Sequence, residues 1–189
     1  VGSEMCIRDR LSTGQISALT TTQVAGVSTT TMAALSTAQL AAISTKDIAA
    51  LSTAQLSAVS TTNLAALSTA QITAMTTAQV GALAANMSTT QIGALTTAQT
   101  AGLTTTVISS LATAQLQAIS TKDIAALSTT QAAGLSTTVL GNLTAAQLKA
   151  IETKDIAAMS TTQLGALTTT QVGTCLLYTS PSPRDRQKS

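Results

Sequence analysis

Leu35-Ser36-Thr37-Ala38-Gln39-Leu40-Ala41-Ala42 is a clean copy of an eight-residue unit that recurs about twenty times between Leu11 and Thr174. We number the positions of this octad from its large apolar residue. The consensus is apolar, Ser or Thr, Thr, then Ala, Thr or Lys, then Gln or Asp, apolar, small, and Ala or Gly. Self-similarity at a fixed short period is typical of stacked structural units and not of a globular domain with a pocket.

Helix-start signals coincide within each octad. Position 2 is Ser or Thr in eighteen of the twenty octads, with Ala112 and Glu152 as the exceptions, and position 5 is Gln in thirteen and Asp in three. Ser/Thr-x-x-Gln predicts a capping box, in which the hydroxyl accepts from the backbone N–H three residues on and the Gln side chain returns to the N–H of the cap residue. Large apolar residues at positions 1 and 6 then predict a hydrophobic staple.

The expected architecture is all-α: a solenoid with one very short capped helix per octad over residues 11–174. Isolated helices of fewer than roughly 12–15 residues are marginal in water, so helices of this size depend on their neighbours. A β-solenoid is the alternative, because Thr favours strands. Positions 1 and 6 have opposite parity, however, so a strand would place the two apolar residues on opposite faces. The regular apolar content disfavours a third reading, disorder.

A longer period lies on top of the octads. Lys122-Asp123-Ile124 returns 32 residues later as Lys154-Asp155-Ile156, which indicates a sequence unit of four octads. One interruption, residues 83–86, adds four residues between octads. Four residues are about one helical turn. We therefore expect Leu83 and Met87 to stay on one face, and one helix simply to be longer.

The composition of the repeat excludes several kinds of function. Residues 11–174 contain no aromatic residue, His, Cys or Pro. Four positive and four negative charges make the repeat neutral: Lys46, Asp47, Lys122, Asp123, Lys149, Glu152, Lys154 and Asp155. Without a basic face or an aromatic platform, binding to nucleic acid is not expected. No run of eighteen apolar residues occurs, so no transmembrane segment is expected either.

The two ends break the repeat abruptly. Residues 1–9 read like the codons GTG GGC TCG GAG ATG TGT ATA AGA GAC, and residues 175–185 read like the reverse complement of that string, extended in frame. Both ends therefore resemble translations of one transposase-type sequencing adaptor. We interpret residues 1–10 and 175–189 as adaptor-derived artefacts and exclude them from fold reasoning, together with Cys6 and Cys175. The repeat is then expected to be an internal fragment of a longer protein.

The only charges that recur as a motif are the Lys-Asp pairs at 46–47, 122–123 and 154–155. They are either a periodic docking stripe or, as we prefer, solvated first turns in which Asp completes the cap. Carboxylates spread along a rod do not converge on a metal ion, and the repeat lacks His and Cys ligands, so no metal site is expected. Ser and Thr hydroxyls have no imidazole to activate them, so no catalytic residue is expected.

Other motifs have simple structural readings. Four Met side chains lie at positions 1 or 6 and are expected to fill the core: Met32, Met75, Met87 and Met159. Asn86-Met87-Ser88 and Asn142-Leu143-Thr144 match the N-glycosylation acceptor, a match that is common by chance. Rows of Thr and Gln invite comparison with an ice-binding face, but such a face needs flat strands, which the parity of positions 1 and 6 disfavours.

Leu51–Ala58 and Leu67–Ala74 resemble the Leu-Thr-Thr-Ala-Gln-Val/Ile-Ala-Ala-Leu arrays of very large bacterial repeat proteins, often described as haem-utilisation or adhesion proteins. The resemblance covers residues 11–174 and implies an extracellular or cell-surface setting. It transfers no cofactor-binding residue, because the repeat contains no His or Tyr to ligate haem.

Uniform units without a chemically distinct patch predict a structural spacer in an adhesin-like surface or secreted protein, with no catalysis and no cofactor. The alternative is a repeat module that binds a protein or a glycan through the hydroxyls and amides of one solenoid face. Variation at an outward position would favour that alternative, yet position 4 varies among only a few residue types.

Overall fold

A computed structural model describes residues 11–169 and 171, which form short helices joined by turns and contain no strand. The chain divides into two compact units, residues 1–103 and 104–189. The described helices of the first unit are α2 (Thr13–Ser17), α3 (Thr21–Ala25), α4 (Thr29–Ala34), α5 (Thr37–Ala41), α6 (Thr45–Ala50), α7 (Thr53–Ser57), α8 (Thr61–Ala65), α9 (Thr69–Ala74), α10 (Thr77–Leu83), the 3-10 helix η1 (Ala84–Asn86), α11 (Thr89–Gly93) and α12 (Thr97–Ala101). Those of the second unit are α13 (Thr105–Ser110), α14 (Thr113–Ala118), α15 (Thr121–Ala125), α16 (Thr129–Gly134), α17 (Thr137–Asn142), α18 (Ala145–Ala150), α19 (Thr153–Ala157) and α20 (Thr161–Gly165).

Each octad forms one helix in the same way. In α7, for example, the N-cap residue Ser52 at position 2 is extended (φ −73°, ψ 156°), and the helix runs from position 3 to position 7. Position 1 of the octad is again extended where it follows a helix directly, as Leu51 is (φ −64°, ψ 145°). The predicted all-α solenoid is confirmed, and the β-solenoid alternative is excluded for the described residues.

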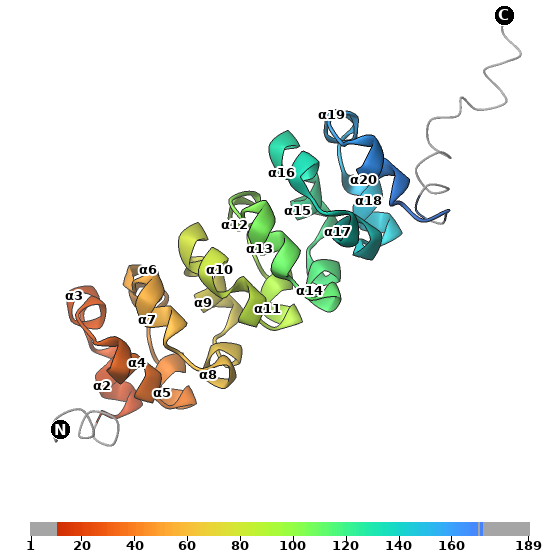
Figure 1. The fold of residues 1–189 in the computed structure, drawn as a ribbon. Helices are drawn as coiled ribbons and strands as arrows, with labels where there is room; N and C mark the ends of the chain where they lie inside the picture. Colours follow the sequence, from red (N-terminus) through yellow and green to blue (C-terminus); the bar gives the residue numbers. More distant parts are fainter. Residues whose placement is uncertain (1–10, 170, 172–189) are drawn as a thin grey trace, which may run out of the picture. The chain divides into compact units, whose positions relative to one another are not determined.

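Helices three octads apart pack on each other within each unit (Figure 1). In the first unit α6 contacts α3 and α9, and α7 contacts α4 and α10. In the second unit α18 packs on α15, and α19 packs on α16. One coil of the solenoid therefore contains three octads, which the octad sequence alone did not predict.

Large apolar side chains at positions 1 and 6 form the core, as the staple pattern predicted. Leu40, Ile48 and Leu56, all at position 6, have no exposed surface, and position 1 residues such as Leu51 are 3% exposed. Full burial of one such side chain contributes about 1.5–3 kcal/mol. Two of them in most octads make apolar burial the main force that holds such short helices in place.

The four-residue insert changes one coil. As expected, Leu83 and Met87 are both buried, but the helix is lengthened only in part: α10 reaches seven residues at Leu83 and continues as the 3-10 helix η1. Beyond the insert, Gln91 bonds to the carbonyl of Leu67, 24 residues earlier, where the corresponding separation in regular coils is 28 residues. This coil thus consists of two octads and the insert, and four residues take the place of a whole octad.

Glycine serves close packing here and not unusual backbone geometry. No described residue has a positive φ. A Cβ atom built on Gly134 at the end of α16 would lie 2.6 Å from Cγ2 of Thr105, and one on Gly102 would clash with the methyl of Thr77. At these two octads the coils approach each other too closely for the Ala that other octads carry at position 8.

Candidate functional site

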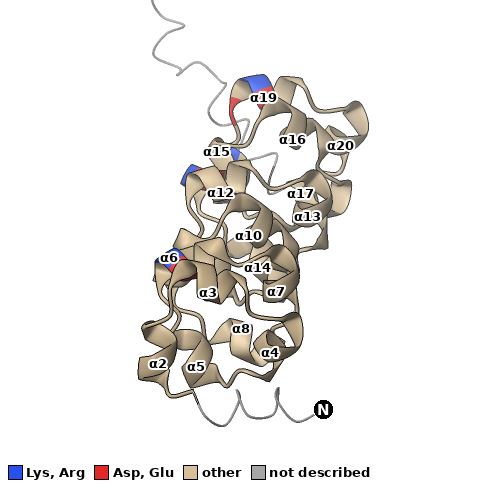
Figure 2. Ribbon diagram, turned by 90° about the vertical axis from the view of Figure 1, so that its left-hand side faces the viewer, with Lys and Arg blue, Asp and Glu red and all other residues tan. Residues whose placement is uncertain are grey.

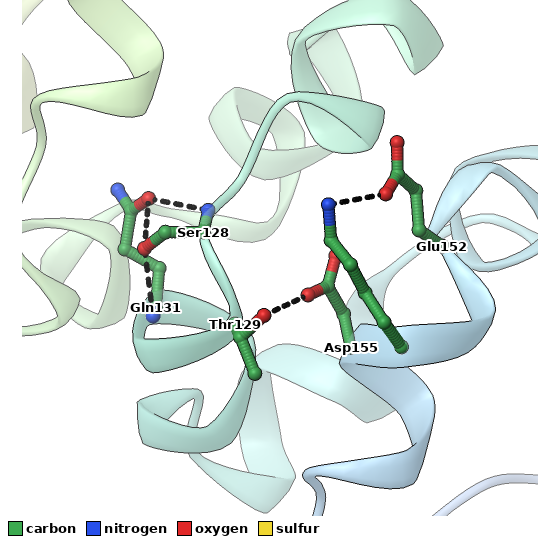
Figure 3. Close-up of polar contacts among 6 residues, drawn as sticks. Ser128, Thr129, Gln131, Glu152 and Asp155 are labelled. Carbon is green, nitrogen blue, oxygen red and sulfur yellow. Dashed lines mark hydrogen bonds and ion pairs between the residues drawn. The ribbon is translucent and has the colours of Figure 1, made fainter.

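Polar side chains at positions 2 and 5 form the reciprocal cap that the sequence predicted. In α10 the Thr76 N–H donates to Oε1 of Gln79 at 2.7 Å, and the Gln79 N–H donates to Oγ1 of Thr76 at 3.3 Å. Figure 3 shows the same arrangement between Ser128 and Gln131. At the two exceptional octads the box is incomplete: Gln115 still accepts from the N–H of Ala112, and Glu152 makes no side-chain cap bond.

From α5 onward, the other end of the position 5 Gln side chain makes a contact between coils that sequence reasoning missed. Nε2 of Gln79 donates to the main-chain oxygens of Ile48 at 3.0 Å, Ala49 at 3.3 Å and Leu51 at 2.6 Å. These oxygens lie at the end of α6 and in the turn that follows it. The same pattern recurs in the second unit, where Nε2 of Gln147 donates to Leu116 and Ile119.

This contact solves a problem that short helices share. Every α-helix leaves its last carbonyls without an intrahelical partner, and many helices end with a glycine in the left-handed conformation. Here the last carbonyl groups accept from a Gln amide of the next coil, with the carboxamide itself nearly buried, as at Gln79 (2% exposed). One carboxamide therefore begins its own helix through its oxygen and ends an earlier helix through its nitrogen.

Asp at position 5 is tied to different partners. Asp47 in α6 is 5% exposed; its Oδ2 accepts from the Ser44 hydroxyl at 2.6 Å, and its Oδ1 accepts from the hydroxyl of Thr21 in α3 at 2.8 Å. Asp155 in α19 likewise accepts from Thr129 in α16 at 2.6 Å (Figure 3). An Asp cannot donate a hydrogen bond when ionised, so it binds a hydroxyl group where Gln binds carbonyl groups.

The prediction that the Lys-Asp pairs form solvated first turns is therefore wrong for the Asp residues. Asp47, Asp123 and Asp155 are buried, whereas Lys46, Lys122 and Lys154 are exposed. The Asp side chain is one methylene shorter than Gln, and no Asp octad forms the reciprocal box. Its carboxylate instead faces a threonine of the coil beneath in α6 and α19.

The recurring charges of the second unit do not form a stripe. Since helices three octads apart stack, α15 packs with α18, and α16 packs with α19. The pairs on α15 and α19 are four octads apart and so belong to different stacks. The 32-residue sequence period moves the repeated feature from one stack to another, and Figure 2 shows that few residues along the ribbon are charged.

One exposed ion pair occurs among the described residues. Nζ of Lys154 lies 2.6 Å from Oε2 of Glu152, with side chains 65% and 49% exposed. The hydrogen bond with Glu152, reinforced by its charge, raises the pKa of Lys154 above its ordinary value. A pair exposed to this extent contributes little to stability.

The remaining predicted features lie as follows. Met32, Met75, Met87 and Met159 are buried and fill the core as expected, while Met5, Cys6, Cys175 and the adaptor-like ends lie outside the described residues. Asn86 is exposed at the end of η1. Asn142 is half-buried at the end of α17, where its main-chain oxygen accepts from Nε2 of Gln117 at 3.2 Å.

Few features of the described residues would suit a small-molecule ligand. They contain no group of three His, Cys, Asp or Glu side chains that could hold a metal ion, and none of their helices has the length and hydropathy to cross a membrane. A cavity of about 40 Å³ lies at the start of the first unit, lined mainly by apolar side chains such as Ile16, Leu19 and Val24. Thr100 at position 6 of α12 buries a hydroxyl that has no hydrogen-bond partner.

Comparison with known proteins agrees with this octad architecture. Neither the curated proteins nor the solved structures contain a significant match to the chain. Among protein families, the ALTTAQ repeat matches residues 29–61, 48–85 and 143–174. These three segments cover parts of both units, and they identify an octapeptide-type ALTTAQ repeat region within the chain.

Proposed function

We propose that residues 11–174 are a structural spacer in a large surface-attached or secreted bacterial protein, where they hold another domain at a distance and carry out no catalysis. The observation that carries the proposal is how the polar side chains at positions 2 and 5 are used. The hydroxyl at position 2 and the amide or carboxylate at position 5 are engaged in capping and coil stacking. Of the repeated polar side chains not engaged in this way, mainly the exposed Thr at position 3 remains.

The positions of the recurring Lys-Asp pairs support the same proposal. A binding face built by repetition needs equivalent residues on one side of successive coils. In the second unit the 32-residue period instead moves the Lys-Asp pair from one stack to another, from α15 to α19. This arrangement does not favour the alternative, a protein- or glycan-binding face. The adhesin-like, extracellular setting rests on the resemblance of the octads to bacterial surface repeats.

A coil deletion tests the spacer role. Deleting residues 51–74 removes three complete octads, which is one coil. We expect helical circular dichroism per residue and cooperative urea unfolding to be retained, because each position 5 Gln after the deletion again faces the end of a helix. The matched control deletes residues 51–72, which leaves two residues between octads and breaks the octad phase, and it should lose both properties. A 51–74 deletion that unfolds would contradict the proposal.

Two further measurements test the alternative and the setting. The full chain is screened against a glycan panel, and saturable binding that is lost when residues 51–74 are removed would favour the binding module over the spacer. The genomic reading frame around the repeat is expected to encode a secretion signal or a surface-anchoring segment. A frame that places the repeat inside an intracellular enzyme would contradict the proposed setting.

A further inference from the structure

Position 5 of α17 carries Val139, where the octads on either side carry Gln. The Val139 side chain is 3% exposed and has no polar atom, so α17 forms no capping box with its N-cap residue Ser136. In the later octads of the second unit, each position 5 side chain makes a hydrogen bond to an earlier coil: Gln147, Asp155, Gln163 and Gln171. The contact beneath α17 lacks this link.

The missing link leaves a carbonyl group without a partner. Nε2 of Gln147 donates to the main-chain oxygen of Ile119, 28 residues earlier. The same register places Val139 over Leu111, and α17 packs on both α13 and α14. The Leu111 oxygen accepts no hydrogen bond from the described residues, although Leu111 is only 6% exposed. An unpaired carbonyl group in a nearly buried residue weakens the contact.

A different side chain bridges the same contact. Gln117 at position 7 of α14 donates from Nε2 to the main-chain oxygen of Asn142 at the end of α17, at 3.2 Å. Position 7 is otherwise Ala, Gly, Ser or Thr, apart from Lys149. Gln117 is exposed, so water competes for this hydrogen bond. It therefore holds the two coils together more weakly than a buried position 5 amide would.

We propose that the contact of α17 with α13 and α14, the Val139 contact, opens more often than the neighbouring contact that Gln147 joins, and that Gln117 is the strap across it. Helices this short have no stability of their own, so their N–H groups become exchangeable whenever the coil contact opens. In a spacer the Val139 contact would lengthen first under tension. That consequence rests on the proposed function, whereas the order of opening does not.

Native-state hydrogen exchange of the full 189-residue chain, read by NMR, compares the two contacts. The Leu111 N–H donates to the oxygen of Ile108, and the Ile119 N–H donates to the oxygen of Leu116, so the two amides occupy equivalent helix ends. After correction for intrinsic rates, the Leu111 amide should exchange at least about tenfold faster, because only its contact lacks the buried amide. Equal exchange of the two amides would overturn the proposal.

Restoring the amide tests the cause. Val139→Gln introduces the usual position 5 residue and should slow exchange of the Leu111 N–H at least about tenfold. Val139→Met is the matched control, because Met has a helix propensity close to that of Gln but no amide, and it should change the rate less than about twofold. Circular dichroism confirms that each variant is folded. Equal rates in the two variants would contradict the proposal.

Removing the strap should act in the opposite direction. Gln117→Ala should speed exchange of the Leu111 and Leu140 amides about two- to fivefold, because an exposed hydrogen bond makes a small contribution to the contact. Ala favours helix more than Gln does, so helix propensity alone would slow exchange. Unchanged or slower exchange would show that Gln117 is not a strap. None of these outcomes depends on the spacer role, which the coil deletion tests separately.

Discussion

Helices α6 and α10 come from octads of the same pattern and stack their first turns on earlier coils in two different ways. Gln79 in α10 both accepts from its own N-cap and donates to three carbonyl groups at the end of α6. Asp47 in α6 donates nothing and accepts from the Thr21 hydroxyl of α3. The comparison shows that the position 5 side chain forms the joint between coils, that is, the hydrogen-bonded link from one coil to the earlier coil. Whether this side chain donates or accepts decides which group of the earlier coil it contacts.

Asn63 in α8 combines the two modes. Its Nδ2 donates to the oxygen of Leu35 at 2.7 Å, as a Gln would, and its Oδ1 accepts from the Thr37 hydroxyl at 2.8 Å, as an Asp would. It forms no capping box. A short amide therefore reaches both partners of the coil beneath but loses the reciprocal bond to its own N-cap.

Removing only the donor from a Gln octad should produce the largest effect. In Gln79→Glu at pH 7, a nearly buried carboxylate would face three carbonyl oxygens, and the expected loss in the free energy of unfolding is about 3 kcal/mol. Urea denaturation measures it. Gln23→Glu is the matched control, because Glu also closes a capping box and the Gln23 amide has no acceptor among the described residues. Equal losses in the two variants would refute the joint between coils.

Removing the acceptor from an Asp octad should have the next largest effect. Asp47→Ala would leave the hydroxyls of Thr21 and Ser44 without their carboxylate, at an expected cost of about 2 kcal/mol. Asp47→Asn should change the free energy of unfolding by less than about 0.5 kcal/mol, because Asn63 shows that an amide suits the same place. Thermal unfolding at constant pH compares the two, and a larger cost for Asn than for Ala would contradict the assignment.

The position 3 threonine of the earlier coil gives a second comparison between Asp and Gln octads. Thr21 lies under Asp47 and is bonded to it, whereas the hydroxyl of Thr53 in α7 makes no hydrogen bond and lies under the Gln79 octad. Thr21→Val should cost about 1 kcal/mol, and Thr53→Val should cost less than about 0.5 kcal/mol. Both replace the first helical residue, so differences in helix propensity cancel. Similar losses would mean that the hydroxyl of Thr21 does not stabilise the coil contact.

The smallest expected effect concerns a buried polar group that takes part in neither the Gln nor the Asp type of coil contact. The Thr100 hydroxyl in α12 is buried and has no partner. Thr100→Val retains the shape and removes the unpaired group, so the free energy of unfolding should rise by about 0.5–1 kcal/mol. Chemical denaturation measures the change, and a loss of stability would show that this hydroxyl has a role that the structure does not contain.

Local structure could be predicted from the sequence because its causes lie within one octad. Ser52 and Gln55, for example, are three residues apart, and both bonds of their capping box are local. Apolar residues at positions 1 and 6 likewise predicted the core. The insert was predicted only in part, because a helix that lengthens by one turn does not indicate which octad of the coil it replaces.

The joint between coils could not be predicted in the same way, because its partners are 28 residues apart in regular coils and the number of octads per coil decides which residues meet. One signal in the sequence did point to it. A capping box accepts Glu as readily as Gln, yet none of the twenty octads has Glu at position 5. The preference for Gln indicates that its amide nitrogen is needed. No comparable residue preference in the sequence indicates the number of octads per coil.

The most direct test of the central claim, that the Gln amide nitrogen joins coil to coil, uses Gln147→Glu in the second unit. Nε2 of Gln147 donates to the oxygens of Leu116 and Ile119 at 2.7 and 2.8 Å. The carboxylate of the variant would face these oxygens, which should raise its folded-state pKa above the unfolded value of about 4.3. Stability relative to the unaltered chain is then lost as the pH rises through the folded pKa and is recovered below the unfolded pKa.

Urea unfolding of both chains from about pH 7 to pH 3 measures this difference, with the unaltered chain subtracted at each pH. We predict that the deficit of Gln147→Glu shrinks steadily on acidification, because a protonated carboxyl regains one O–H donor. A deficit that stays constant across the whole range would contradict the account.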